Sequence, residues 1–363
     1  MWTFLRPDAA AVLKDKTARE SLDRYFGVMQ NEKTAKFLIA RSLPVDFSKD
    51  APTPRLWEIH SRLLEEFRVR ENETDCHLES VGQLGALCQS LLDLKIEIAN
   101  RTTASCHFCT RRCGVNRDRG EKGYCKCGSK IAVSSMFEHV GEEPELVPSG
   151  TIFTMGCTMR CCHCQNWTIS QWVEHGEIQS PEGLARAVER LRVSGCRNVN
   201  LVGGDPTPWL AQWLTVFRHV STNVPVVWNS NSYYSEEAAN LLAGFVDLYL
   251  LDFKYGNNEC AKRLSDAPGY WEACTRNHLY GKKYGELLVR VLVLPNHLEC
   301  CVKPILEWIS RNLGPKTRTN IMFQYRPEWR AHEIPELRRC LTAAEKKTAI
   351  AMAKRAGLVN FIT

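Results

Sequence analysis

The sequence predicts an α/β protein of 363 residues, a partial (β/α)6 TIM-like barrel with a helical N-terminal extension and a cysteine-rich metal knuckle. Three patterns predict this class. From Gly150 onward, six short apolar runs alternate with amphipathic helical stretches, as in a parallel sheet built from βα units. Before residue 100, apolar positions recur at intervals of three and four, which is typical of helices. Between these regions lies a block of cysteine, glycine and basic residues that is too rich in turn formers for regular structure.

The N-terminal extension, residues 1–100, is expected to be helical. One helix face is marked by the apolar side chains Leu56, Ile59, Leu63 and Phe67. The proline-bearing stretch 50–55 divides the extension into two parts. Residues 91–100 are expected to form a helix that leads into the cysteine-rich segment, residues 101–145.

The barrel is expected over residues 146–330, followed by a helical C-terminal segment, 331–363. Its strand candidates are 151–154, 198–202, 224–229, 248–253, 287–294 and 321–325. Helices are expected between them at 181–193, 209–219 and 235–244. Six strands favour an open or partial barrel over a closed eightfold one. Because chemistry in such sheets lies at the carboxyl ends of the strands, the residues after each run are the first functional candidates.

The composition excludes several classes of protein. With 44% hydrophobic and 24% charged residues, the chain is neither disordered nor fibrous. The net charge of +6 is too mild to indicate a nucleic-acid partner. No apolar run approaches the roughly 20 residues of a membrane span, and the N-terminus lacks the pattern of a secretory signal. We therefore expect a cytoplasmic protein whose 17 cysteines are metal ligands or core residues rather than disulfides.

The strongest functional signal is the loop that follows the first barrel strand. Cys157, Cys161 and Cys164 have the spacing C-x3-C-x2-C, which lets one loop present three thiolates to one cluster. A structural zinc or a saturated [4Fe–4S] cluster takes four thiolates, so three leave one iron open for a small ligand. The alternatives are a zinc knuckle that uses Cys162 as a fourth ligand, and a redox thiol cluster.

This motif, placed after a strand and before a βα series, resembles that of the radical S-adenosylmethionine (SAM) superfamily. The resemblance implies a [4Fe–4S] cluster whose open iron binds the amine and carboxylate of SAM. It also implies reductive cleavage of SAM to a 5′-deoxyadenosyl radical that abstracts hydrogen, with an external electron donor of the flavodoxin or ferredoxin type. His163 stands where the family usually has an aromatic residue near the adenine, and Cys162 is expected to be a spare thiol.

The turns after the next two strands extend the resemblance. Gly-Gly-Asp-Pro after the second strand resembles the family's Gly-Gly-Glu turn, whose backbone meets the SAM amine, and Asp205 can face an ammonium. Polar residues after the third strand are placed to bond ribose or carboxylate oxygens. Each set alone is also consistent with an ordinary turn. The cofactor-binding residues expected here are Gly203, Gly204, Asp205, Pro206, Asn229, Ser230 and Asn231.

The fourth and fifth strands indicate one branch of the superfamily. Asp252 and Lys254 match the Asp-x-Lys of the glycyl-radical-enzyme activating branch, which makes them catalytic candidates, although a charge pair at a strand end is the alternative. Arg290 resembles a basic residue of that branch that faces SAM, but Val291 replaces the adjacent His. The chain thus resembles uncharacterised relatives of pyruvate formate-lyase activating enzyme. This resemblance implies a protein or peptide substrate, with a small molecule as the alternative.

A second cysteine set precedes the barrel. Cys106, Cys109, Cys113 and Cys125 can close around one ion, with Cys127 as a substitute ligand. A structural metal that folds a polar loop is the favoured interpretation, and an auxiliary electron-transfer cluster is the alternative. Zinc, iron or a cluster would each suit these thiols. The remaining cysteines are expected to be core or incidental thiols: Cys76, Cys88, Cys196, Cys260, Cys274, Cys300, Cys301 and Cys340.

A competing hypothesis is a non-catalytic zinc or iron–sulfur protein that recruits a partner through its N-terminal helices. It predicts zinc at both cysteine sets and no affinity for SAM. Nucleic-acid modification would instead need a basic stripe, and the nearest basic run, residues 111–122, is as easily a solvated loop.

Overall fold

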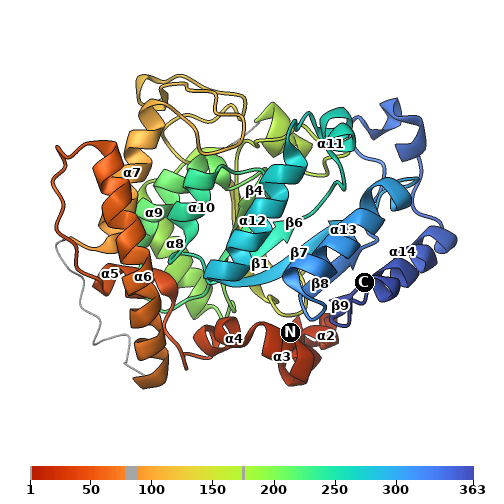
Figure 1. Cartoon of the computed structure of the whole chain (residues 1–363), viewed down its shortest axis with the longest axis horizontal. Coiled ribbons are helices and arrows are strands. Elements are labelled where there is room, and N and C mark those ends of the chain that lie inside the picture. Colours follow the sequence, from red (N-terminus) through yellow and green to blue (C-terminus); the bar gives the residue numbers. More distant parts are fainter. Residues whose placement is uncertain (1, 78–88, 174–175) are drawn as a thin grey trace.

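A nine-stranded sheet forms the centre of the protein (Figure 1), in the order β3-β1-β2-β4-β5-β6-β7-β8-β9. The computed structural model describes residues 2–77, 89–173 and 176–363. Six strands pair in parallel and in chain order: β2 (Ser149–Thr154), β4 (Val199–Gly203), β5 (Val226–Ser230), β6 (Leu248–Asp252), β7 (Glu286–Leu292) and β8 (Arg318–Met322). These are the six predicted strands, with β8 beginning before its predicted range. The α/β class is therefore confirmed.

The sheet also has three strands that the sequence pattern did not indicate. β1 (Ala132–His139) pairs antiparallel with β2 and with β3 (Glu177–Ile178), while β9 (Phe361–Ile362) extends the parallel part beside β8. In β1 only Val133 is buried and the other positions are half-buried or exposed, so this strand lacks the continuous apolar run of a central strand. β3 and β9 are the two edges of the sheet, which is consistent with the open barrel expected.

Helices follow the parallel strands and cover the sheet. α8 (Pro181–Val193), α9 (Leu210–His219) and α10 (Glu236–Leu242) match the three predicted helices. α8 begins at Ser180, whose hydroxyl accepts from the amide of Gly183, with proline at the first helical position. The later helices are α11 (Asn258–Ser265), α12 (Tyr270–Tyr284), α13 (Lys303–Trp308) and α14 (Ala343–Arg355).

The N-terminal helices share the core of the sheet. They are α1 (Trp2–Leu5), α2 (Pro7–Ala11), α3 (Lys16–Ser21), α4 (Asp23–Met29), α5 (Lys36–Ser42), α6 (Thr53–His77) and α7 (Leu91–Ala104). Figure 1 shows α5, α6 and α7 beside α8, α9 and α10, and α7 contacts α9. Phe67 and Leu91 belong to the same buried cluster as Trp228 and Tyr249 of the sheet. None of the helices in the described part of the chain combines the length and hydropathy needed to cross a bilayer.

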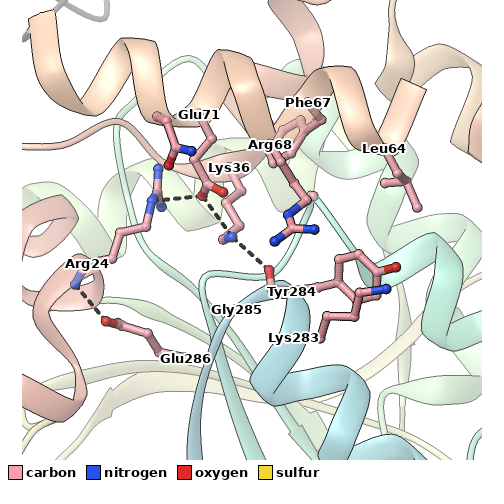
Figure 2. A pocket seen from close by; sticks show the side chains of 12 residues that line it. Arg24, Lys36, Leu64, Phe67, Arg68, Glu71, Lys283, Tyr284, Gly285 and Glu286 are labelled. Atoms are coloured by element: carbon pink, nitrogen blue, oxygen red, sulfur yellow. Dashed lines mark hydrogen bonds and ion pairs between the residues drawn. The ribbon is translucent and has the colours of Figure 1, made fainter. Parts of the chain in front are cut away.

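Ion pairs tie these helices to the amino end of the sheet (Figure 2). Glu71 of α6 lies 2.8 Å from both Arg24 and Lys36, measured between the carboxylate and the charged nitrogens. Lys36 also donates to the carbonyl of Tyr284 at 2.7 Å, and the amide of Arg24 donates to Glu286 at 2.7 Å. Because Glu286 begins β7, this cluster lies at the end of the strands opposite to the carboxyl ends. Its charged groups are paired with one another, which is the arrangement of a structural contact rather than of a ligand site.

Candidate active site

A cavity of about 420 Å³ lies at the carboxyl ends of the parallel strands. This volume is within the roughly 300–1,000 Å³ typical of small-molecule sites. Most of the site residues predicted from the sequence line it: Cys157, Cys161, His163, Cys164, Gly203, Gly204, Asn229, Ser230, Asn231, Asp252, Lys254 and Arg290. Their positions in the chain are far apart, so the parallel topology is what brings them together.

The three-cysteine loop follows β2 and is held by backbone hydrogen bonds from outside the loop. The amides of Arg160 and Cys162 donate to the carbonyls of Ser265 and Leu264 at 2.9 and 2.8 Å, which joins the loop to the end of α11. Cys162 is not among the residues that line the cavity, whereas the three motif cysteines are. This placement agrees with the expectation that Cys162 is a spare thiol.

The three motif thiols are spread more widely than the ligands of a single ion. Among the described residues, one group of three or more potential ligands has all its ligand atoms within 4.8 Å of one another. That group does not include the motif cysteines. A [4Fe–4S] cluster takes each thiolate on a different iron, so its ligands stand farther apart than those of a lone zinc. The spacing therefore suits a cluster.

The glycine turn after β4 packs directly against the cysteine loop. A Cβ atom on Gly204 would lie 2.1 Å from the carbonyl oxygen of Gly156, a distance that no side chain tolerates. The amide of Asp205 donates to that same oxygen at 3.0 Å. Glycine is thus required at position 204 because two backbone segments touch there.

Asp205 and Pro206 lie outside the cavity lining. The carboxylate of Asp205 is buried and accepts from the Ser230 hydroxyl at 2.8 Å and from the Asn231 amide at 3.1 Å. Its second oxygen accepts from the Thr207 amide at 3.2 Å. The structure therefore places Asp205 behind the wall, where it fixes the end of β5, rather than facing a ligand as the sequence suggested.

Hydrogen-bond donors surround the motif sulfurs. The Asn231 side-chain amide and the Met159 backbone amide each donate to the sulfur of Cys157 at 3.4 Å. The sulfur of Cys164 lies 3.2 Å from the hydroxyl of Ser170. Burial raises the pKa of Cys161 to about 12, and nearby Lys254 opposes that rise. Such donors and cations stabilise thiolate ligands and set the potential of a cluster.

Asp252 and Lys254 form an ion pair on the cavity wall. The ammonium of Lys254 donates to the Asp252 carboxylate at 2.6 Å, and both side chains are largely buried. Burial alone would lower the pKa of Lys254, but the attraction of Asp252 together with that of Cys161 and Cys164 outweighs it and raises that pKa to about 12. Lys254 therefore stays charged.

Arg290 is bound by two glutamates that the sequence pattern did not indicate. Its guanidinium donates to Glu143 at 2.7 and 2.6 Å and also contacts Glu142. It donates further to the side-chain carbonyl of Asn229 at 3.1 Å. Arg290 lines the cavity as predicted, but its charge is more than offset by these carboxylates.

His163 presents an unsatisfied nitrogen at the cavity. Burial, and secondarily Lys254, lowers the pKa of His163 to about 3, so the ring is neutral. Its Nδ1 atom is buried with no hydrogen-bond partner among the described residues. Buried polar atoms in proteins are nearly always paired, so this atom fits a ligand donor. The unpaired His163 nitrogen and the three motif thiols that line the cavity therefore fit a [4Fe–4S] cluster and SAM.

The second cysteine set gathers beside the first. The thiols of Cys106, Cys109, Cys113 and Cys125 lie close enough to perturb one another's ionisation, and Arg117 donates to the Cys125 sulfur at 3.4 Å. The thiol of Cys127 instead donates to the carbonyls of Cys125 and Met155, each at 3.4 Å. A Cβ atom on Gly156 would lie 2.2 Å from the Cys127 sulfur, so the two loops are in contact.

Three of the remaining thiols belong to a group that the sequence spacing did not indicate. Cys260, Cys300 and Cys301 gather with His297 into a group with metal-ligand spacing. Sequence spacing missed this group because its members come from two separate segments, α11 and the helical turn Leu298–Val302 with the preceding His297; only the vicinal pair offered a signal. Of the others, Cys196 and Cys274 are buried, Cys76 and Cys340 are exposed, and Cys88 lies outside the described residues.

Comparison with known proteins identifies the fold that carries this cavity. The family model described as the radical SAM superfamily matches residues 151–309, which run from β2 into α13. The chain belongs to the radical SAM superfamily. The match covers the cysteine loop, the glycine turn and the strands that bear Asp252 and Arg290.

Two relatives come from Methanocaldococcus jannaschii. Uncharacterized protein MJ0674 is 42% identical over 343 residues, covering 93% of this radical SAM chain and 98% of the relative. Uncharacterized protein MJ0808 is 24% identical over 254 residues, covering 63% of this chain and 73% of the relative.

Crystal structures of Streptococcus suis SuiB are distant structural neighbours. One SuiB structure matches with a TM-score of 0.41 and 13% identity, over 58% of this chain and 47% of SuiB. The structure bound to S-adenosylmethionine gives a TM-score of 0.42 at 12% identity, over 58% and 48% of the two chains. The structure bound to the precursor peptide SuiA gives the same score and identity, over 57% and 46%. The chain thus spans about half the length of SuiB.

Proposed function

We propose that this protein is an enzyme that cleaves SAM reductively, with Cys157, Cys161 and Cys164 holding a [4Fe–4S] cluster. The observation that carries the proposal is the single cavity that these three thiols share with the glycine turn and the polar ends of β5, β6 and β7. When bound, the cluster supplies the electron that splits the sulfonium of SAM, which produces the hydrogen-abstracting 5′-deoxyadenosyl radical. An external donor of the flavodoxin or ferredoxin type provides that electron.

The charges around the cavity support a cationic ligand. Glu142, Asp252, Lys254 and Arg290 line it, and Glu143 holds Arg290 from behind, so carboxylates outnumber cations by one. SAM carries two positive groups and one carboxylate. An excess of negative charge in a partly buried site favours such a ligand.

Individual side chains then have distinct roles. The neutral ring of His163 offers its free Nδ1 as an acceptor or donor for the adenine. The tight contact between Gly204 and Gly156 keeps the glycine turn against the cysteine loop, so that the backbone reaches the methionyl end of SAM. Lys254 stays protonated and faces the thiolates, where its charge offsets theirs.

We further propose a protein or peptide substrate, as in the glycyl-radical-enzyme activating branch. The Asp252–Lys254 pair on the cavity wall supports this finer assignment, because that pair lies near SAM and the target peptide in the branch that the chain resembles. A small-molecule substrate is the alternative outcome. The same proposal includes a second metal site at Cys106, Cys109, Cys113 and Cys125. These four thiols do not form a described group whose sulfurs all lie within 4.8 Å of one another, and this wider spacing favours a cluster over a single ion.

The test is 5′-deoxyadenosine formation in protein reconstituted anaerobically with iron and sulfide, then given dithionite and SAM. Wild type and Cys162→Ala should form the product, whereas Cys161→Ala should form at least 100-fold less. Cys162→Ala is the matched control because its thiol is adjacent in the chain but lies outside the cavity lining. If wild type carries only zinc and forms no 5′-deoxyadenosine, the proposal fails and a partner-recruiting metalloprotein takes its place.

A further inference from the structure

Four potential metal-ligating side chains, none of them from the two predicted cysteine sets, converge beyond the carboxyl ends of β6 and β7. Cys260 lies on α11, and Cys300 and Cys301 lie on a π-helical turn, Leu298–Val302, which His297 immediately precedes. Their ligand atoms all lie within 4.8 Å of one another, and no other described group of three or more does so. The two segments follow β6 and β7. The group therefore lies toward the carboxyl end of the strands, the end that also carries the active site.

The distances match a tetrahedral ion. With zinc–sulfur bonds of about 2.3 Å and zinc–nitrogen bonds of about 2.0–2.1 Å, a tetrahedron places two sulfurs about 3.8 Å apart and sulfur and nitrogen about 3.6 Å apart. The Cys300 sulfur lies 4.0 Å from that of Cys260 and 3.9 Å from that of Cys301. The Nδ1 atom of His297 lies 3.7, 3.3 and 4.0 Å from the sulfurs of Cys260, Cys300 and Cys301.

These spacings exclude the other common roles of clustered cysteines. A disulfide needs a sulfur–sulfur distance of about 2.05 Å, and all three cysteines are free thiols. A [4Fe–4S] cluster distributes its ligands over separate irons and would hold them farther apart. Three thiols and one imidazole around a common centre are a closed ligand set, which is typical of structural zinc.

The surroundings of His297 also fit a metal ligand. Its other ring nitrogen, Nε2, lies 3.5 Å from the guanidinium of Arg263 and 3.7 Å from the carboxylate of Glu336, and these two groups pair with each other at 2.7 Å. A carboxylate near the far nitrogen is a common neighbour of a zinc-bound histidine, where it helps to orient the ring. Cys260, His297 and Cys301 are buried and Cys300 is exposed, which gives the ion an entry side.

We propose that Cys260, His297, Cys300 and Cys301 bind one Zn²⁺ ion. Binding deprotonates the three thiols, releases three protons and leaves Nδ1 of a neutral imidazole on the metal. No oxidant or reductant is needed. The site stands independently of the proposed SAM cleavage.

The ion would brace the active-site loop from behind. Cys260 lies on α11, and the end of that helix accepts the amides of Arg160 and Cys162 in the three-cysteine loop. On the other side, a Cβ atom on Gly256 would lie 2.6 Å from the carbonyl of Cys301, so the chain just after Lys254 packs on the same site. One ion therefore connects the segment that carries Lys254, α11 and the π-helical turn.

Differential alkylation of the wild-type chain tests the site without any variant. Anaerobically purified protein, loaded with Zn²⁺ or stripped with a chelator, is treated with iodoacetamide and digested for mass spectrometry. Cys260, Cys300 and Cys301 should be protected together in the zinc form, with Cys300 labelled at least tenfold more slowly than Cys340, which is also exposed. Equal labelling of Cys300 and Cys340 in the zinc form, or a disulfide among the three thiols, would overturn the proposal.

Metal content of variants gives a second, independent measure. Relative to wild type, His297→Ala and Cys300→Ser should each lose one equivalent of zinc with iron unchanged, while Cys340→Ser, the exposed control, loses none. His297→Cys should retain the zinc as a four-thiolate site, which distinguishes loss of a ligand from failure to fold. Zinc content unchanged in His297→Ala would reject the site. In hydrogen exchange, stripping the zinc should speed exchange at the Cys162 amide several-fold, while the Trp228 amide in the central strand stays protected.

Discussion

Replacing Arg290 with methionine should expose how the cavity wall is stabilised. In the folded protein the guanidinium lies among Glu142, Glu143 and Asn229, and both glutamate side chains are almost fully buried. Arg290→Met keeps an unbranched apolar stem but leaves two buried carboxylates without a cation. Breaking a buried ion pair by removing one partner costs roughly 3–5 kcal/mol.

The pKa of Glu142 gives a separate measure of the same interaction. Burial alone would raise it, but Arg290, with help from His139, lowers the pKa of Glu142 from 4.5 to about 2. A difference of this size corresponds to about 3 kcal/mol of folding free energy at neutral pH. In wild type this stabilisation is present above about pH 4.5 and is lost as the pH falls toward 2. It therefore contributes no pH dependence between pH 6 and 8.

The stability of Arg290→Met should depend on pH in the opposite direction. Without Arg290, burial raises the pKa of Glu142 above its ordinary value, so protonation of that carboxylate favours the folded state. Stability should then increase as the pH falls from 8 to 6, by up to the roughly 3 kcal/mol that the pair contributes in wild type. Arg55→Met, which removes an exposed pair with Glu58, is the matched control and should change little.

Urea unfolding of the reconstituted proteins, followed anaerobically by tryptophan fluorescence at pH 8 and pH 6, measures these free energies. A loss of less than about 1 kcal/mol at pH 8, or the same loss at both pH values, would refute the reasoning. It would mean that water or a relaxed backbone already solvates the two carboxylates.

Three further predictions concern the cysteine loop and its ligand. Gly204→Ala should lower the amount of bound iron several-fold, because its Cβ would strike the carbonyl of Gly156. Gly128→Ala is the control and should retain its iron, because a Cβ there meets nothing within 4 Å. Equal iron in the two variants would contradict the importance of this contact. Asn231→Leu removes a hydrogen bond to the Cys157 sulfur worth about 1 kcal/mol, so the cluster potential in spectroelectrochemistry should fall by on the order of 40 mV; an unchanged potential would count against that bond. Because burial lowers the pKa of His163 to about 3, the pH profile of 5′-deoxyadenosine formation from pH 6 to 9 should be the same in wild type and His163→Phe, and an inflection that disappears in the variant would show that the ring titrates.

The sheet was predictable because its central strands are buried on both faces. β5, for example, is buried at every position and reads as an apolar run that ends in polar residues. Strand ends in a parallel sheet meet at one edge, so the same runs also predicted which polar residues would share a cavity. β1 was missed because only one of its positions is buried and polar residues interrupt its apolar ones, so it gives no such run.

The groups that the sequence did not reveal are those assembled over long separations. Glu143 binds Arg290 across 147 residues, and two neighbouring glutamates in a loop read as solvated charge. Cys260 meets His297 across 37 residues, whereas the two predicted cysteine sets each come from one local segment. Spacing in the sequence identifies ligands that lie on one local segment. Only the fold identifies a ligand set whose members come from two distant segments.

The three-cysteine loop has little regular structure of its own, yet a cluster with an open iron requires fixed ligands. On one side the loop contacts Cys127, whose thiol donates to Met155 directly before Gly156, so a metal at the second cysteine set would stiffen that contact. On the other side it bonds to α11, which the proposed zinc would anchor through Cys260. Soft metal ligands thus occur on both flanks of the loop, where Cys125 and Cys260 are buried in the same cluster as the core of the sheet. Metals bound to these thiols would add fixed points beside a loop whose other face must leave the cavity open.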